Sequence, residues 1–380
     1  TAVLFSTAIP ASAPRNLALD SAGNIYAVLA AGIPIGGGGT EGAANFPVKN
    51  SLATCDPNAS LALAALDANG NILQATYIPG SELSTAAVVS GANSSAYVLA
   101  APTQSYTPTS EPSESAGGLW FLAHFVQSPA AQVVSLACEG NSASYASAAV
   151  SPGEIVSLFG NGLGPAVGAQ PQVDAQSGFP KQLAGVQVTF NGIPAPLLYV
   201  QDAQINAIAP WSLQSGDTAQ ICVVYDAAPT NCLSRPVLDA HPGVFTEDGT
   251  YAVAFSLDGT RNSASNPAQV GSIVSLYATG LGPIHPAQPD GSIIELPLPA
   301  DVLSTQLDWQ IPTGIGPEIF GSEPAEYAGP APFAVAGFSQ INMVVPDTYA
   351  CAFGCGWAPL ILQVGSTGFS NYFLVQVAGH

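Results

Sequence analysis

Basic residues are scarce in this chain. Only five of its 380 residues are Lys or Arg, against 25 Asp or Glu, and the formal net charge is −20. Nucleic-acid binding needs clustered basic side chains that contact phosphates, and anionic membrane surfaces attract basic segments, so the composition disfavours both kinds of partner. An acidity of this size mainly keeps a protein soluble.

Long hydrophobic runs are also missing. No stretch reaches the roughly 18 apolar residues of a transmembrane helix, so no membrane span is predicted. With one Met and few Lys or Arg, the chain lacks much of the usual supply of helix-forming residues. Gly (39) and Pro (33) are abundant and separate short apolar runs. These features predict an all-β, multi-domain chain.

Cysteine occurs six times, and an even number favours disulfides in an oxidising compartment. Because no second paired-Cys or His motif lies nearby, zinc is the weaker alternative, and no cofactor or metal is predicted. A chain that begins with Thr rather than Met leads us to expect a processed secreted protein. The predicted disulfides are Cys222–Cys232, Cys351–Cys355 and, by elimination, Cys55–Cys138.

Residues 1–137 contain a first repeat. Asp20-Ser-Ala-Gly-Asn24 and Asp67-Ala-Asn-Gly-Asn71 each stand between short apolar runs, which predicts two β-hairpins. Tyr26-Ala-Val28 recurs as Tyr97-Val-Leu99, so two units of roughly 70 residues are expected.

Several segments of this region resemble the SBBP-type β-propeller repeats of secreted bacterial proteins. They are the Leu-Asp-x-x-Gly-Asn-Ile-Tyr hairpin at 19–26 and the segments at 45–48 and 65–80. The resemblance implies a propeller-repeat-like β region. A closed propeller needs at least four blades, and this region is too short for them. A small open sheet assembly, or sheet edges that another element covers, are the two alternatives.

A second repeat occupies residues 138–380. Residues 154–165 and 272–283 share Ile-Val-Ser-Leu and Gly-Leu-Gly-Pro, and Gln204-Ile-Asn206 recurs as Gln340-Ile-Asn342. Each copy has about seven short strands separated by turn signals, which predicts Ig-like sandwiches at 138–240 and 241–380.

This second region resembles the Solibacter-type uncharacterised C-terminal domain family, which consists of paired bacterial Ig-like domains. The resemblance implies a secreted, surface-associated module and no activity. The segments that support it are 152–160, 186–200, 204–207, 242–246, 262–267 and 276–283.

No segment of the sequence indicates catalysis. The four histidines lack partners at metal-ligand spacing, there is no G-x-S-x-G motif, and nothing places two carboxylates across a cleft. The Asp-x-x-Gly-Asn segments are incomplete as calcium loops, and hairpin turns are favoured. No catalytic residue is therefore predicted, and a secreted hydrolase stays only as a second alternative.

The most concrete hypothesis is a non-enzymatic, structural or adhesive protein at a bacterial cell surface. It self-associates or contacts other surface components. In its sharpest form the chain is the subunit of a homopolymeric filament, and an apolar N-terminal strand completes a neighbour's sheet. The residues of that joint would be Thr1, Ala2, Val3, Leu4, Phe5, Ser6 and Thr7.

The alternative is a secreted carbohydrate-binding protein with polysaccharide as its partner. Tryptophans supply flat apolar rings for sugars, although they more often lie in a sandwich core. Trp309 and Trp357 are the ligand candidates because both lie outside the shared repeat.

Overall fold

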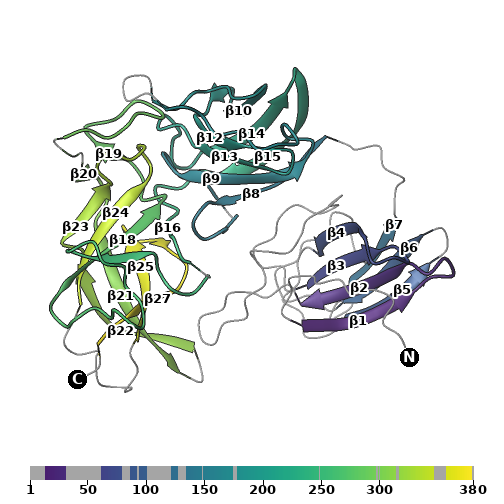
Figure 1. Cartoon of the computed structure of the whole chain (residues 1–380). Coiled ribbons are helices and arrows are strands. Elements are labelled where there is room, and N and C mark those ends of the chain that lie inside the picture. The colour runs from purple at the N-terminus through teal and green to yellow at the C-terminus, as the bar shows by residue number, and fades with distance from the viewer. Residues whose placement is uncertain are drawn as a thin grey trace. The chain divides into compact units, whose positions relative to one another are not determined.

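The computed structural model contains only strands and irregular segments in the residues that it describes, and this confirms the predicted all-β, multi-domain class (Figure 1). None of the described segments is a helix long and apolar enough to cross a membrane. The described residues are 13–30, 61–78, 86–91, 94–100, 121–126, 134–147, 149–173, 178–247, 249–296, 298, 300–313, 316–345 and 357–378. Two compact units contain the strands, one with β1–β7 and one with β8–β27.

The first unit has two antiparallel sheets, with strand orders β1-β2-β3-β4 and β5-β6-β7. Side chains of both sheets share one core, in which Tyr26 and Val28 of one sheet lie with Val98 and Phe125 of the other. The strands are β1 (Ala13–Leu19), β2 (Ile25–Ala30), β3 (Leu61–Leu66), β4 (Ile72–Ile78), β5 (Ala86–Gly91), β6 (Ser95–Ala100) and β7 (Phe121–Val126).

Both Asp-x-x-Gly-Asn segments form hairpin turns, as predicted. The Oδ1 of Asp20 accepts hydrogen bonds from the backbone N–H groups of Ala22 and Asn24, at 2.9 and 2.8 Å. Asp67 Oδ1 makes the same pair of bonds in the turn between β3 and β4. Each carboxylate thus stabilises its own turn, as Asx turns do, which favours the hairpin over the calcium interpretation.

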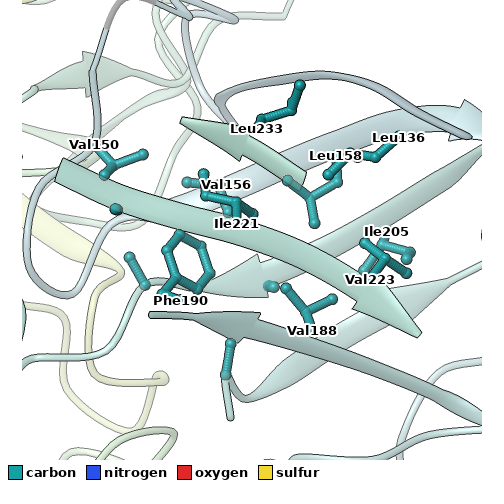
Figure 2. Packing of buried hydrophobic residues seen from close by; sticks show 14 of the residues in the cluster. Leu136, Val150, Val156, Leu158, Val188, Phe190, Ile205, Ile221, Val223 and Leu233 are labelled. Atoms are coloured by element: carbon teal, nitrogen blue, oxygen red, sulfur yellow. The ribbon is translucent and has the colours of Figure 1, made fainter. Parts of the chain in front are cut away.

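The second unit begins with a sandwich of two four-stranded sheets, β11-β10-β14-β15 and β12-β13-β9-β8. Figure 2 shows its core, where Phe190 and Ile221 of one sheet meet Val156 and Leu158 of the other. The strands are β8 (Ser135–Asn141), β9 (Ile155–Asn161), β10 (Val186–Phe190), β11 (Ile193–Pro194), β12 (Leu197–Val200), β13 (Gln204–Ile208), β14 (Thr218–Tyr225) and β15 (Ala228–Pro236).

A second sandwich follows, with sheets β16-β18-β24-β23 and β22-β21-β25-β26, while β17 and β27 extend them and β19 pairs with β20. Its strands up to β21 are β16 (Gly243–Val244), β17 (Ala254–Ser256), β18 (Ile273–Thr279), β19 (Ile284–His285), β20 (Ala300–Asp301) and β21 (Thr305–Thr313). The others are β22 (Gly316–Pro324), β23 (Tyr327–Pro330), β24 (Ser339–Val344), β25 (Trp357–Val364), β26 (Gly368–Phe369) and β27 (Phe373–Gln376).

The repeated Ile-Val-Ser-Leu segments form equivalent strands of the two sandwiches. They are β9 and β18, which each lie between two partner strands in their sheet. The Gly-Leu-Gly-Pro bends that follow bury their leucines, Leu163 in the first core and Leu281 in the second. Burial of a leucine contributes about 1.5–3 kcal/mol, so the repeat is explained by packing.

Direct contacts join the two sandwiches. Thr279 Oγ1 of the second accepts a hydrogen bond from Ile155 N of the first at 2.8 Å and donates one to Gly337 O. Trp211 N donates to Asp290 Oδ1 at 2.9 Å. Buried residues of both sandwiches, among them Ile155 and Val335, form a shared apolar cluster. The second unit therefore has a packed junction between its sandwiches.

Candidate binding surface on the paired sandwiches

The Gln-Ile-Asn motif lies at equivalent places in the two sandwiches. In the first, Asn206 of β13 is paired with Ser157 of β9, and in the second Asn342 of β24 is paired with Ser275 of β18. The isoleucine between Gln and Asn is buried in the core of each sandwich. Since side chains alternate along a strand, both polar residues lie on the outer face of the sheet.

Hydrogen bonds hold these amide side chains in place. Gln340 Nε2 donates to Asn342 Oδ1 at 2.9 Å, and Ser275 Oγ donates to the same oxygen at 2.8 Å. Gln204 Nε2 makes the equivalent 2.9 Å bond to Asn206 Oδ1. Within the described part of the chain, Gln340 Oε1 and Asn342 Nδ2 have no partner, and neither atom is buried. One acceptor and one donor are thus left for a ligand.

Four aromatic rings form a row beside the amides of the second sandwich. Tyr277, opposite Gln340 in the register, stacks on Phe338 with ring centroids 5.3 Å apart and planes at 20°. Phe245 continues the row at 5.4 Å from Phe338, and Phe255 meets the edge of Tyr277 at 6.1 Å. All four rings are half-buried, so each keeps some contact with solvent.

The row begins at the junction between the sandwiches. Phe338 packs against the cluster that contains Ile155 and Ile208, and both isoleucines lie on the outer face of the first sandwich. Phe159 pairs with Gln204 there as Tyr277 pairs with Gln340 in the second sandwich. The aromatic and amide residues of both domains therefore belong to outer faces that meet at Phe338.

A buried ion pair lies at the same junction. His241 Nδ1 is 2.9 Å from Glu154 Oε1, and Glu154 Oε2 accepts a 2.7 Å bond from Ser151 N. Burial acts to lower the pKa of His241, but the charge of Glu154 and its hydrogen bond outweigh burial, so the pKa of His241 is raised. When the ring of His241 is protonated, it and the Glu154 carboxylate attract each other across the junction.

Glu139 and Arg235 form a second buried pair close by. Arg235 Nε donates to Glu139 Oε2 at 2.8 Å, while Glu139 Oε1 is buried without a partner. Burial, and then the charge of Glu154, raise the pKa of Glu139 to about 8, although Arg235 opposes the shift. Folding therefore favours a protonated Glu139 at neutral pH.

Ser151, Glu154 and His241 do not have the geometry of a hydrolase triad. In a triad the histidine contacts the serine and the acid lies behind the histidine. Here Glu154 lies between the other two, because Ser151 Oγ is 3.2 Å from Glu154 Oε2 and the histidine contacts the other carboxylate oxygen. Ser151 is also fully buried, so a substrate cannot reach it. These contacts are structural.

The described residues contain no group of three or more His, Cys, Asp and Glu side chains that could hold a metal ion. The paired sandwiches therefore present aromatic rings and neutral amides as their candidate binding chemistry.

The structure describes only some of the site residues that the sequence predicts. Cys222 and Cys232 form the predicted disulfide across β14 and β15, with Cα atoms 4.4 Å apart. Cys138 is also disulfide-bonded, but Cys55, Cys351 and Cys355 lie outside the described residues, as do Thr1–Thr7. The two remaining pairings and the filament joint stay predictions.

The backbones of Trp309 and Trp357 belong to β21 and β25, paired with Leu360 and Gln376. Their side chains lie outside what the structure describes, so the ligand hypothesis for them is untested. Sequence reasoning did not select the aromatic row. The sequence offered one signal for it, an aromatic residue directly after Ile-Val-Ser-Leu in both copies of the repeat, Phe159 and Tyr277.

No family model and no curated protein matches this chain. Among solved structures it is similar to the surface glycan-binding protein SGBP-B from the mixed-linkage glucan utilization locus of Bacteroides ovatus, solved with a mixed-linkage heptasaccharide. The identity is 11% and the TM-score 0.28, over 75% of this chain and 52% of that one. PbSGBP-B, a surface glycan-binding protein of Prevotella bryantii, has 12% identity and a TM-score of 0.20, over 59% and 36% of the two chains.

The gamma-CGTase of alkalophilic Bacillus clarkii has 13% identity and a TM-score of 0.21, over 75% and 37%. The chain thus spans about half or less of the length of each of these proteins. Likenesses with such low TM-scores carry no argument about function, and the resemblances seen in the sequence stay predictions.

Proposed function

We propose that this protein is a non-enzymatic, extracellular polysaccharide-binding protein of a bacterial surface. The observation that supports the proposal is the aromatic row beside free amide groups on the outer face of β18 and β24. Sugar rings have apolar C–H faces that pack on aromatic rings and hydroxyl groups that need donors and acceptors. A surface with both kinds of group suits a glycan.

The extracellular location is supported by the Cys222–Cys232 disulfide. Disulfides persist in oxidising compartments and are rare in reducing ones. The excess of acidic residues, with a net charge of −20, favours neutral rather than acidic polysaccharides because like charges repel. The proposed ligand is accordingly an uncharged chain of sugars.

Native affinity electrophoresis in gels that contain mixed-linkage β-glucan, xylan or starch tests the proposal. Retardation by at least one neutral polysaccharide is expected. Tyr277→Ala should weaken binding by about tenfold or more, because a central aromatic contact is lost. Gln340→Ala should weaken it while leaving the four rings in place.

Phe369→Ala is the matched control, since Phe369 is an aromatic residue of the same sandwich, exposed on β26. Its retardation should equal that of the wild type. Absence of retardation in every gel would overturn the proposal. Equal retardation of the wild type, Tyr277→Ala and Gln340→Ala would show that this surface is not the binding site.

A structural or adhesive role is the second candidate. It is favoured by an apolar face that the first unit leaves exposed on β5, β6 and β7. The filament joint at Thr1–Thr7 lies outside the described residues, so that form of the hypothesis is a prediction for electron microscopy. Regular fibres of purified protein at neutral pH would support it, and discrete particles would contradict it.

A further inference from the structure

The outer face of the first sandwich has the same arrangement of amides as that of the second. Gln204 Nε2 and Ser157 Oγ both donate to Asn206 Oδ1, at 2.9 and 3.4 Å, and the second sandwich has the same two bonds to the asparagine of its Gln-Ile-Asn motif. Within the described part of the chain, Gln204 Oε1 and Asn206 Nδ2 have no partner, and neither atom is buried. The first sandwich therefore offers a ligand the same acceptor and the same donor.

A pair of aromatic rings stands beside the amides in both sandwiches. Phe159 and Tyr277 follow Ile-Val-Ser-Leu in the repeat and are each paired with the glutamine of Gln-Ile-Asn. Tyr145 lies next to Phe159, with ring centroids 6.0 Å apart and planes at 48°. Phe255 lies next to Tyr277 in the same way, at 6.1 Å and 71°. The first sandwich thus has both kinds of group on which the proposed glycan binding of the second depends.

The second ring of each pair comes from a different position of the repeat. Phe255 belongs to β17 and is paired with Ser275 of β18. The corresponding partner of Ser157 is Gly140 of β8, which has no side chain. Tyr145 belongs instead to the loop after β8, and its backbone lies directly over this glycine, because a Cβ at Gly140 would be 2.8 Å from Tyr145 O. The sequence repeat alone therefore does not account for a second ring in the first sandwich.

The backbone of Tyr145 has a conformation that bulky residues rarely adopt. Its φ is +58°, in the left-handed region, which costs free energy for a residue with a Cβ. Tyr145 N donates to Asn141 O at 2.7 Å and closes a tight turn that glycine would fit without strain. The chain has a tyrosine there instead, and its side chain is 42% exposed with no hydrogen-bond partner for the hydroxyl among the described residues. Packing in a core does not explain this residue, whereas contact with a ligand does.

We propose that the outer face of the first sandwich is a second glycan-binding site, and that one polysaccharide chain occupies both sites. The inference rests on the proposed function, since both faces are given the same ligand chemistry. Aromatic rings would pack on the C–H faces of the sugars, and the free amide groups would bind their hydroxyls. The side chains of the second site are Tyr145, Phe159, Gln204 and Asn206.

The packed junction keeps the two sites within reach of one polymer. β18 ends at Thr279, whose side chain accepts a hydrogen bond from the backbone N–H of Ile155, the first residue of β9. At about 3.3 Å for each residue along the strands, Tyr277 and Phe159 are no more than roughly 30 Å apart. A long polysaccharide can span such a distance. Binding at two linked places raises its affinity above that of either site alone, so loss of one site should have a large effect.

Affinity electrophoresis of the full chain, in gels with the polysaccharide that retards the wild type, tests the second site. Tyr145→Gly removes the ring and supplies the residue that suits the left-handed turn, so its unfolding temperature should be no lower than that of the wild type. Its dissociation constant should rise by about tenfold or more. Gln204→Ala should weaken binding while leaving both rings in place. Phe369→Ala is again the control and should bind as the wild type does.

The double variant Tyr145→Gly/Tyr277→Ala separates the two sites. Each single variant should keep a weaker retardation, and the double variant should show none. A wild type that no polysaccharide retards would overturn the proposed function together with the second site. If Tyr277→Ala weakens binding but Tyr145→Gly and Gln204→Ala bind as the wild type does, only the second site is overturned. Complete loss of retardation in Tyr277→Ala, or a lower unfolding temperature of Tyr145→Gly, would also contradict the second site.

Discussion

His241 Nδ1 lies 2.9 Å from Glu154 Oε1, and this contact joins the start of the second sandwich to a buried carboxylate of the first. The histidine belongs to the segment between β15 and β16, where one domain ends and the next begins. Both sandwiches must fold before the pair can form. Protonation of this pair therefore affects the stability of the junction.

The first prediction is that stability falls as pH rises from about 5 to 8. The raised pKa of His241 means that its contribution is present below the ordinary histidine value of 6.5 and is lost as pH rises through the folded value. Glu139, with a pKa raised to about 8 from 4.5, also holds a proton that the unfolded chain releases. Urea unfolding at several pH values measures how steeply the free energy of unfolding falls with pH.

The variant Glu139→Gln shows how much of this pH dependence comes from Glu139. One proton contributes at most about 1.4 kcal/mol per pH unit, so the slope should become shallower by up to this amount. Glu295→Gln, at an exposed carboxylate of the same unit, is the control and should leave the slope as it is. Stability that increases over this pH range would contradict the prediction.

The second prediction concerns Asp301. Both of its carboxylate oxygens are buried without a hydrogen-bond partner, and burial raises its pKa to about 7. Asp301→Asn should increase the free energy of unfolding at pH 8 by roughly 1–3 kcal/mol, because no charge is then buried. At pH 5 the folded carboxyl is protonated while the unfolded one is still ionised, so the gain should be smaller than at pH 8, and it should vanish only below the ordinary aspartate pKa of 3.8. If Asp301→Asn is instead less stable than the wild type at pH 8, the charged carboxylate of Asp301 stabilises the fold and the prediction is wrong.

The third prediction compares two glycines with the same backbone conformation. Gly153 has φ +73° and Gly271 has φ +74°, but a Cβ at Gly153 would overlap the ring of Trp211 whereas one at Gly271 meets nothing. Gly271→Ala should cost about 1 kcal/mol for the left-handed conformation alone. Gly153→Ala should cost roughly 1–3 kcal/mol more, because the packing of Trp211 at the junction is disturbed. Equal losses in thermal unfolding would show that Trp211 moves aside freely.

The fourth prediction concerns the disulfide. Cys222 and Cys232 are directly paired across β14 and β15. The double variant Cys222→Ser/Cys232→Ser should lose about 2–3 kcal/mol of stability, since the bond restricts a short loop in the unfolded chain. Unfolding in urea without reducing agent measures the loss and leaves the other cysteines unchanged. An unchanged midpoint would mean that the hairpin alone holds these strands.

Local structure was the most predictable part of this protein. The turns at Asp20 and Asp67 depend on hydrogen bonds within five residues, so their sequence is sufficient to indicate them. The repeated Ile-Val-Ser-Leu segments were recognisable as equivalent strands because the same residues recur before the same Gly-Leu-Gly-Pro bend.

The aromatic row could not be predicted in this way. Phe245, Phe255, Tyr277 and Phe338 come from four separate segments, and antiparallel pairing of β16, β17 and β24 with β18 brings them together. Attention to residues outside the repeat selected Trp309 and Trp357 instead, while Tyr277, the centre of the row, lies within it. Contacts between distant segments leave little trace in a single sequence.

Composition and local pattern by themselves determined the β class, the hairpins and the internal repeats. Tertiary structure alone decided which repeated side chains are covered. Tyr26 and Tyr97 have equivalent neighbours along the chain and across their strands, yet one is buried and the other exposed. The physical reason is that burial depends on the sheet packed against a face, and that sheet is formed by residues far away in the sequence.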